Sequence, residues 1–260
     1  MTAGSQLPNM DGDRTAYRLN PRPLARGGQA EVIVAEHKVT GAKVAFKRLN
    51  SRNPRAVARM RREIELGGVL RGHAHVMPVL DHGPAFDWFV MPLAEENAEQ
   101  ASQRLTSGEK LVELLHAVCA ALGAAHDLGW VHRDLKPANL LLLEDKWMVA
   151  DWGLGRRPRG DTTFNGRTVA GQFLGTEGFA APEQETDPHG ALATVDIYSV
   201  GQIIGWARTR QEPRQGQALI PADEPWRTIV AAATDRVPER RPQTAAALRQ
   251  LIDDELARTA

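Results

Sequence analysis

Two short polar motifs constrain this chain more than any other feature of its sequence. Residues 132–139 read His-Arg-Asp-Leu-Lys-Pro-Ala-Asn, and Asp151-Trp152-Gly153 follows twelve positions later. Together they place two carboxylates, an ammonium group and a side-chain amide in one short segment. Each motif alone occurs by chance, so its meaning depends on what accompanies it along the chain.

Composition restricts the class of protein. The 260 residues are 42% apolar and 25% charged, as in an ordinary globular protein of one large domain or two fused lobes. Lys+Arg and Asp+Glu both number 32, so the zero net charge gives no reason to expect a nucleic-acid or anionic-membrane partner. The single cysteine, Cys119, excludes an internal disulfide framework. Without a membrane-length apolar run or a signal-peptide core, the chain is predicted to be soluble and cytoplasmic, with no membrane segment.

The first part of the chain has a mixed α/β pattern. Residues 1–16 are polar and predict a flexible lead-in. Short β-branched runs within residues 17–49 flank Thr40-Gly41, a turn signal, and predict a hairpin. Apolar residues at helical spacing predict a helix over 54–70, and strand-like runs return over 76–93.

Beyond Ala94 the pattern becomes mainly helical. A long apolar-periodic helix is predicted over 107–128, with Ser107 as its N-cap. Two further helices are predicted over 191–208 and 244–256. The chain therefore divides into a small mixed part and a larger helical part.

Four more motifs accompany the first two in a fixed order: Val44-Ala45-Phe46-Lys47, Ala181-Pro182-Glu183, residues 196–201 and Arg241-Pro242. With them, residues 17–256 resemble the protein kinase family, and in particular the bacterial eukaryotic-like (Hanks-type) Ser/Thr protein kinases.

The resemblance implies an α+β, two-lobed fold. Residues 17–94 would form a small β-rich N-lobe with one main helix, and residues 95–260 a larger, mainly α-helical C-lobe. In the family the late arginine, here Arg241, pairs with the Ala-Pro-Glu glutamate, here Glu183.

The resemblance also implies roles for the motif residues in phosphoryl transfer from Mg-ATP, with Mn²⁺ as an alternative ion, to Ser or Thr hydroxyls of protein substrates. Lys47 would hold the α and β phosphates, and Asp151 and Asn139 the metal ions. Asp134 would accept the substrate hydroxyl proton, while Lys136 steadies the γ-phosphate.

Lysine is scarce in this chain, which makes its placement informative. Only six of the 32 basic residues are lysine, yet both phosphate positions, Lys47 and Lys136, carry it. An ammonium group and a planar guanidinium are not interchangeable at such a site. The lysine placement therefore indicates a working site.

Two further catalytic positions follow from the resemblance. Glu63 on the predicted helix 54–70 fits the acidic partner of Lys47, and Glu65 is the alternative. The Thr176 hydroxyl would bridge Asp134 and Lys136, the arrangement of Ser/Thr-directed members.

The remaining nucleotide-binding positions lie in the phosphate-covering loop, the hinge and the strands around them: Ala25, Gly27, Gly28, Val32, Ala45, Met91, Pro92, Ala94 and Leu141. The phosphate-covering loop, residues 25–32, departs from the family's glycine pattern, because only its middle glycine, Gly27, is in place. Alanine adds a Cβ and penalises positive φ, so a stiffer loop and weaker nucleotide affinity are expected.

Trp152 replaces the usual phenylalanine of the metal motif. With Glu63 as the helix glutamate, the position expected to face this ring is Gly67, which has no side chain. A larger ring at position 152 and the absence of a side chain at position 67 would conserve the packed volume. We therefore hypothesise that Trp152 and Gly67 pack together.

A threonine-rich loop follows the metal motif, with Thr162, Thr163 and Thr168 as candidate phosphorylation sites. In the family an arginine such as Arg133 binds a phosphate in this loop. Autophosphorylation through a transient homodimer is expected, and a plain solvated loop is the alternative.

Other residues have structural explanations. His132 is expected to be packed rather than to act as a base, and His73, His75 and His82 to be satisfied or exposed rather than metal-bound. Cys119 is expected in the core.

Two other functions remain open. A pseudokinase acting as a nucleotide-binding or scaffolding module would explain the altered loop and Trp152, but Lys47, Asp134, Asn139 and Asp151 oppose it. A small-molecule phosphotransferase is disfavoured by Gly175-Thr176 and residues 181–183, which form a peptide platform in the family.

Overall fold

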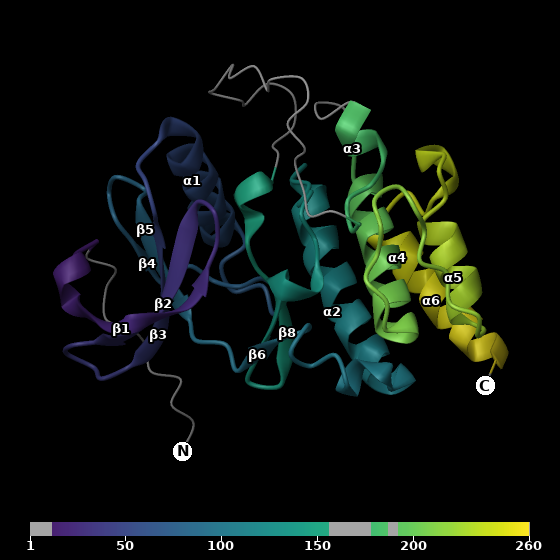
Figure 1. Ribbon diagram of the computed structural model, residues 1–260, viewed down its shortest axis with the longest axis horizontal. Helices are drawn as coiled ribbons and strands as arrows, with labels where there is room; N and C mark the ends of the chain where they lie inside the picture. Colours follow the sequence, from purple (N-terminus) through teal and green to yellow (C-terminus); the bar gives the residue numbers. More distant parts are fainter. Residues whose placement is uncertain (1–11, 156–177, 187–191, 260) are drawn as a thin grey trace.

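The computed structural model describes residues 12–155, 178–186 and 192–259. A β-sheet with one long helix occupies one side of the molecule, and a group of helices occupies the other (Figure 1). This arrangement confirms the predicted two-lobed α+β fold. Within the described ranges, no helix is both long and apolar enough to span a bilayer.

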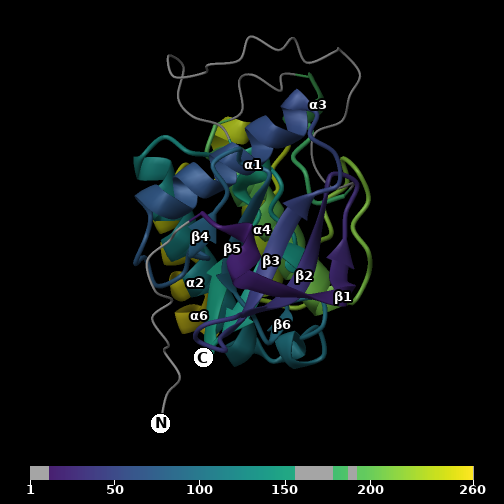
Figure 2. The same cartoon turned by 90° about the vertical axis from the view of Figure 1, so that its left-hand side faces the viewer.

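Five antiparallel strands form the first sheet, in the order β1-β2-β3-β5-β4 (Figure 2). They are β1 Tyr17–Arg26, β2 Ala30–His37, β3 Lys43–Leu49, β4 Asp81–His82 and β5 Trp88–Pro92. The predicted hairpin is the β2–β3 pair, and its turn needs Gly41 at a φ of +71°, which glycine adopts without steric cost. Opposite faces of this sheet pack in two separate clusters, because side chains alternate along a strand.

Helix α1, Pro54–Val69, covers one face of the sheet (Figure 2). Asn53 caps it by accepting the Ala56 N–H at 2.9 Å, and Pro54 occupies the first turn. Its buried positions recur every three or four residues and pack with Ala45 of β3 and Phe89 of β5. Lys47 lies two positions after Ala45 and therefore shares this face.

A second, three-stranded sheet positions the two polar motifs. Its strands run in the order β6-β7-β8 and are β6 Glu96–Asn97, β7 Leu140–Leu143 and β8 Lys146–Val149. Strand β7 begins immediately after Asn139, and β8 ends two residues before Asp151. Because the two strands pair antiparallel, the Ala150 N–H reaches the Asn139 carbonyl at 2.9 Å. The hairpin therefore brings the two motifs side by side.

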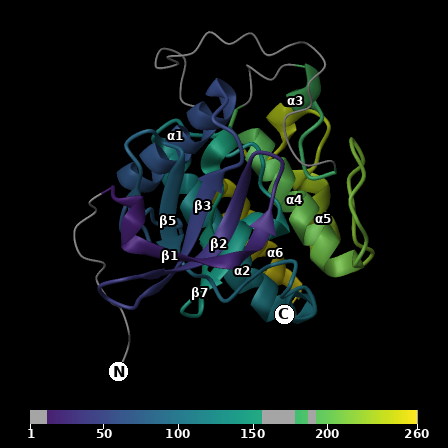
Figure 3. The ribbon, with the colours of Figure 1, turned by 60° about the vertical axis from the view of Figure 1, so that its left-hand side comes forward.

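The helical part is built around α4. Helix α4 lies between α2 and α5 (Figures 1 and 3). Every position of α4 from Thr194 to Ala207 is buried, as in a helix that packs on all sides. The helices here are α2 Gly108–Asp127, α3 Glu183–Thr186, α4 Thr194–Thr209, α5 Trp226–Ala233 and α6 Ala245–Thr259. Short 3₁₀ segments cover Arg14–Ala16, Arg104–Thr106, Pro137–Asn139, Trp152–Leu154 and Pro238–Arg240.

Residues 12–16 are the part of the predicted flexible lead-in that lies within the described residues, and local contacts order them. Residues 14–16 form a 3₁₀ turn, with Asp13 accepting the Thr15 N–H at 2.8 Å. The Gly12 N–H donates to Asp81 at the end of the sheet at 3.2 Å. The local cap and this long-range hydrogen bond within the chain hold a polar segment in place, although the segment has no hydrophobic pattern that predicts secondary structure.

Candidate active site

A cavity of about 830 Å³ separates the first sheet from the helical part, and its walls come from both. It is lined by all but one of the predicted catalytic and nucleotide-binding residues: Ala25, Gly27, Gly28, Val32, Ala45, Lys47, Glu63, Met91, Pro92, Ala94, Asp134, Lys136, Asn139, Leu141 and Asp151. Thr176 lies outside the described residues. The structure therefore brings into one cleft positions that are more than a hundred residues apart.

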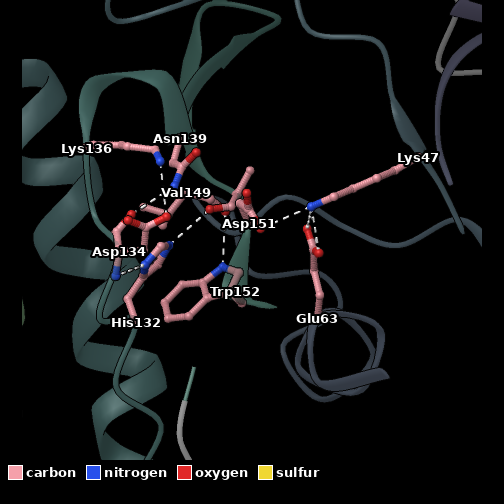
Figure 4. Close-up of polar contacts among 10 residues, drawn as sticks. Lys47, Glu63, His132, Asp134, Lys136, Asn139, Val149, Asp151 and Trp152 are labelled. Atoms are coloured by element: carbon pink, nitrogen blue, oxygen red, sulfur yellow. Dashed lines mark hydrogen bonds and ion pairs between the residues drawn. The ribbon is translucent and has the colours of Figure 1, made fainter. Parts of the chain in front are cut away.

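At the centre of the cleft Lys47 contacts two carboxylates (Figure 4). Its Nζ lies 2.8 Å from Glu63 Oε2 and 3.0 Å from Asp151 Oδ1. Glu65 instead accepts from Arg61 at 3.0 Å on the outer face of α1. Of the two candidate acids, Glu63 is thus the one in contact with Lys47.

Burial and the neighbouring charges shift the pKa values of Lys47, Glu63 and Asp151 in opposite directions. Burial alone would lower the pKa of Lys47, but the carboxylates of Asp151 and Glu63 outweigh it and raise that pKa. Lys47 holds the pKa of Asp151 below its ordinary value against the effect of burial. Burial raises the pKa of Glu63 to about 7, with Lys47 opposing. Lys47 is therefore a permanent cation beside an ionised Asp151.

Asp134, Lys136 and Asn139 face the same cleft from residues 132–139, which we call the catalytic loop (Figure 4). Lys136 Nζ lies 3.1 Å from Asp134 Oδ2, and the Asn139 amide N–H donates to the Asp134 carbonyl at 2.8 Å. That bond fixes the amide plane and leaves the Asn139 side-chain oxygen for another partner. Asp151, at φ +61°, is in the left-handed region that non-glycine residues rarely adopt. Such backbone conformations are enriched at functional sites.

Sequence reasoning missed Asp196 as the support of this loop. The carboxylate, fully buried at the start of α4, accepts the backbone N–H groups of His132 and Arg133, each at 2.8 Å. The ring of His126 donates to the same carboxylate. Burial would raise the pKa of Asp196, but the His126 hydrogen bond and the other contacts hold it below its ordinary value. A lone acid opening an otherwise apolar helix is the sequence signal for this role.

His132 is packed, as expected from the sequence. Its ring is fully buried, with Nε2 donating to the Ala150 carbonyl at 3.0 Å and Nδ1 accepting the Asp134 N–H at 3.3 Å. Both ring nitrogens are occupied by backbone groups. The ring therefore connects the two polar motifs rather than acting on a substrate.

The space beside Gly67 is occupied by Val79, whereas the sequence hypothesis placed the Trp152 indole there. A Cβ built on Gly67 would lie 2.6 Å from Val79 Cγ2, and its three nearest atoms all belong to Val79. Trp152 instead packs on His132, with ring centroids 4.5 Å apart, and donates to the Val149 carbonyl at 3.3 Å. The missing side chain makes room for Val79 in the chain segment before β4.

The phosphate-covering loop does not need the positive φ angles that alanine penalises. Among the described residues with positive φ, none lies between Ala25 and Ala30. Ala25 pairs with Val32 within the β1–β2 ladder. The penalty of alanine for positive φ therefore does not arise, and only its added Cβ remains as a difference from the family pattern.

Arg59 is a second residue that sequence reasoning missed. It lies one helical turn before Glu63 on α1, and its side chain lines the cleft. Burial lowers the pKa of its guanidinium, while Asp134 and Asp151 oppose that effect. The sequence signal for this position was its spacing: Arg59 lies four residues before Glu63, so the two side chains share one face of the helix.

The last motif pair is also in contact. The two terminal guanidinium nitrogens of Arg241 donate to the Glu183 carboxylate, Nη1 at 2.5 Å and Nη2 at 3.0 Å. Arg241 also donates to the Thr194 carbonyl at the start of α4. Residues 162, 163 and 168, the candidate phosphorylation sites, lie outside the described residues.

The fold and this cleft define a protein kinase domain. Residues 20–259 match the family model for the protein kinase domain, and the chain belongs to that family. It is similar to the serine/threonine-protein kinase PknE of Mycobacterium bovis, with 31% identity over 78% of this chain and 36% of the relative. It is also similar to PknD of Mycobacterium tuberculosis, with 30% identity over 84% of this chain and 32% of the relative. These relatives confirm the predicted likeness to bacterial Hanks-type kinases, and the chain spans about a third of their length.

Proposed function

We propose that this chain transfers the γ-phosphoryl group of ATP to serine and threonine hydroxyls of proteins. The observation that carries the proposal is the contact of Lys47 with both Glu63 and Asp151 in a cleft that also holds Asp134 and Lys136. The family match and the names of the relatives support Ser/Thr kinase activity for the domain, and neither favours a pseudokinase.

Each polar group of the cleft has a chemical task in this proposal. Lys47 neutralises charge on the α and β phosphates, and Glu63 keeps its ammonium group pointed into the cleft. Lys136 neutralises charge that develops on the transferring phosphoryl group. Asp134 orients the substrate hydroxyl and accepts its proton. The hydroxyl oxygen bonds to the γ phosphorus as the bond to the bridging oxygen breaks, and ADP leaves.

The donor atoms fit a hard divalent cation. Within the described residues, one oxygen of Asp151 contacts Lys47 and the other has no hydrogen-bond partner, and the Asn139 amide oxygen is likewise left over. Carboxylate and amide oxygens are the ligands that Mg²⁺ prefers. Magnesium, or manganese in its place, would supply neutralisation of phosphate charge when bound by Asp151 and Asn139.

Three finer proposals accompany the activity. One kinase domain spans residues 17–256, with its lobes joined near residue 94. Thr176 acts with Asp134 and Lys136 on the substrate side. Transient pairing of two copies allows phosphorylation of Thr162, Thr163 or Thr168, with Arg133 receiving the phosphate.

The test is intact mass after incubation with Mg-ATP, beside an Asp151→Asn variant. Added phosphate on the wild-type chain alone, mapped to those threonines, is the expected result. The proposal is overturned if neither the chain nor a general protein substrate gains mass and nucleotide does not raise the thermal stability of the chain. That result would favour the pseudokinase alternative. Stabilisation without transfer would point to a nucleotide-binding module.

A further inference from the structure

Residues 27–29 form the turn between β1 and β2, and they line the same cleft as Lys47. Asn50, immediately after β3, donates from its side-chain amide to the Gly27 carbonyl at 2.9 Å. The backbone N–H of Asn50 donates to the Gln29 carbonyl, also at 2.9 Å. Asn50 itself is exposed and does not line the cleft. One residue outside the cleft thus bonds to both ends of a turn in its wall.

The backbone on either side of Asn50 is itself anchored. Leu49 donates its N–H to the Asp87 carbonyl at 3.0 Å, and the Asp87 carboxylate lies 2.5 Å from Arg52. Asp87 immediately precedes β5, so these contacts continue the pairing of β3 with β5. The Asn50 amide therefore projects from a fixed point, and its hydrogen bond holds the turn relative to the sheet that carries Lys47.

The turn has little other support. Gly27 donates its N–H to the Ala30 carbonyl at 2.9 Å, which closes the turn but does not attach it to β3. A Cβ built on Gly28 has nothing within 4 Å, so this side of the turn is open. Within the described residues, the two bonds from Asn50 are the hydrogen bonds that residues 27–29 receive from outside β1 and β2. The place of the turn in the cleft wall therefore depends on Asn50.

A turn that is held in one place binds a ligand more tightly than a turn that visits several places. The apparent affinity equals the intrinsic affinity multiplied by the fraction of molecules in which the turn is in its binding place. A hydrogen bond that raises this fraction lowers the ordering cost of binding. Ala25 and Ala30 stand where the family pattern has glycine, which led to the expectation of weaker nucleotide affinity. A turn held by Asn50 offsets that effect.

We propose that Asn50 is a positioning residue for the phosphates of the bound nucleotide, and that it acts by holding residues 27–29 over them. The inference rests on the proposed kinase activity, which supplies the nucleotide. Because the base is assigned to the hinge, residues 92–94, the loss of Asn50 should weaken ligands that carry phosphates and leave adenosine unaffected. A merely structural role for Asn50 would weaken both kinds of ligand equally.

The experiment measures the Kd of Mg-ADP and the Kd of adenosine for the full chain by isothermal titration calorimetry. Asn50→Ala is the test variant, and adenosine binding also reports that its cleft is folded. Asn20→Ala is the matched control. Asn20 is an exposed residue of β1 that does not line the cleft, and its side chain accepts the Arg22 N–H at 3.0 Å within the same strand. Phosphate transfer from ATP is measured separately.

Asn50→Ala is expected to raise the Kd of Mg-ADP about three- to tenfold, the equivalent of one hydrogen bond, and to change the Kd of adenosine by less than about twofold. Asn20→Ala should leave both values near those of the wild type. The inference is overturned when Asn50→Ala keeps the wild-type affinity for ADP, or when adenosine loses as much affinity as ADP. Phosphate transfer by a wild-type chain whose Asn50→Ala variant keeps its ADP affinity refutes the role of Asn50 alone. A selective loss of ADP affinity in a chain that transfers no phosphate supports that role and refutes the kinase activity.

Discussion

The carboxylate of Asp196 accepts a hydrogen bond from the ring of His126, with 2.8 Å between Nε2 and Oδ2. One buried acid at the start of α4 thereby connects the last turn of α2 to the catalytic loop, whose backbone N–H groups it also binds. The position of Asp134 therefore depends on a group that touches no substrate.

Replacement of Asp196 should lower the free energy of unfolding of the protein. In Asp196→Asn, the amide offers one acceptor oxygen where three donors converge, so at least one buried N–H loses its partner. A cost of about 1–3 kcal/mol in the free energy of unfolding is expected, measured by urea denaturation.

The chain contains a matched control for this change. His116 and Asp253 form a second His–Asp contact, at 2.7 Å, but with 42% of the Asp253 side chain exposed. Asp253→Asn should change stability by less than about 0.5 kcal/mol. Equal effects of the two substitutions would contradict the role assigned to Asp196.

Glu63→Gln should reduce kcat/KM for peptide phosphorylation by about 10- to 100-fold. A hydrogen bond to a charged group is worth roughly 1.5–3 kcal/mol, and its loss leaves Lys47 less well oriented toward the phosphates. Glu65→Gln, two positions away on α1, should remain near wild-type activity because its partner is Arg61. If Glu65→Gln loses more activity than Glu63→Gln, then Glu65 and not Glu63 is the functional partner of Lys47.

Two neighbouring glycines on α1 should respond oppositely to alanine. The Cβ of Gly67→Ala would meet Val79 at 2.6 Å, whereas a Cβ on Gly68 has nothing within 4 Å. Gly68→Ala should raise the free energy of unfolding by about 0.4–1 kcal/mol, and Gly67→Ala should lower it by roughly 1–3 kcal/mol. Thermal unfolding of the pair tests this. If both substitutions stabilise the protein, the Val79 side chain can move away from the added Cβ without loss of stability.

Cys119 should stay an unreactive thiol in the native protein. It lies buried on α2, and burial raises its pKa to about 12. Thiol labelling at pH 8 should be slow when the chain is folded and rapid in denaturant. Because the folded state holds this proton more tightly than the unfolded state, Cys119 makes stability fall as pH rises from about 9 toward 12. Cys119→Ala should lack that contribution.

Local patterns predicted most elements of the fold. The hairpin of β2 and β3 and the helices α1, α2 and α6 follow from turn residues, caps and periodicity, which act over a few residues. The order of residues 12–16 was not predictable, because it depends on Gly12 donating to Asp81 from 69 positions away. The same limit explains why the side chain facing Gly67 was misassigned.

The sequence by itself determined the chemical groups and their order: Asp134, Lys136 and Asn139 in one motif and Asp151 in the next, with covalent spacing that allows one hairpin to bring them together. Only the tertiary structure decided which acid meets Lys47 and which carboxylate supports the catalytic loop. Asp151 and Lys47 are 104 positions apart, and Asp196 and His132 are 64 apart. Contacts at such separations arise from the packing of whole elements, and no local pattern encodes them.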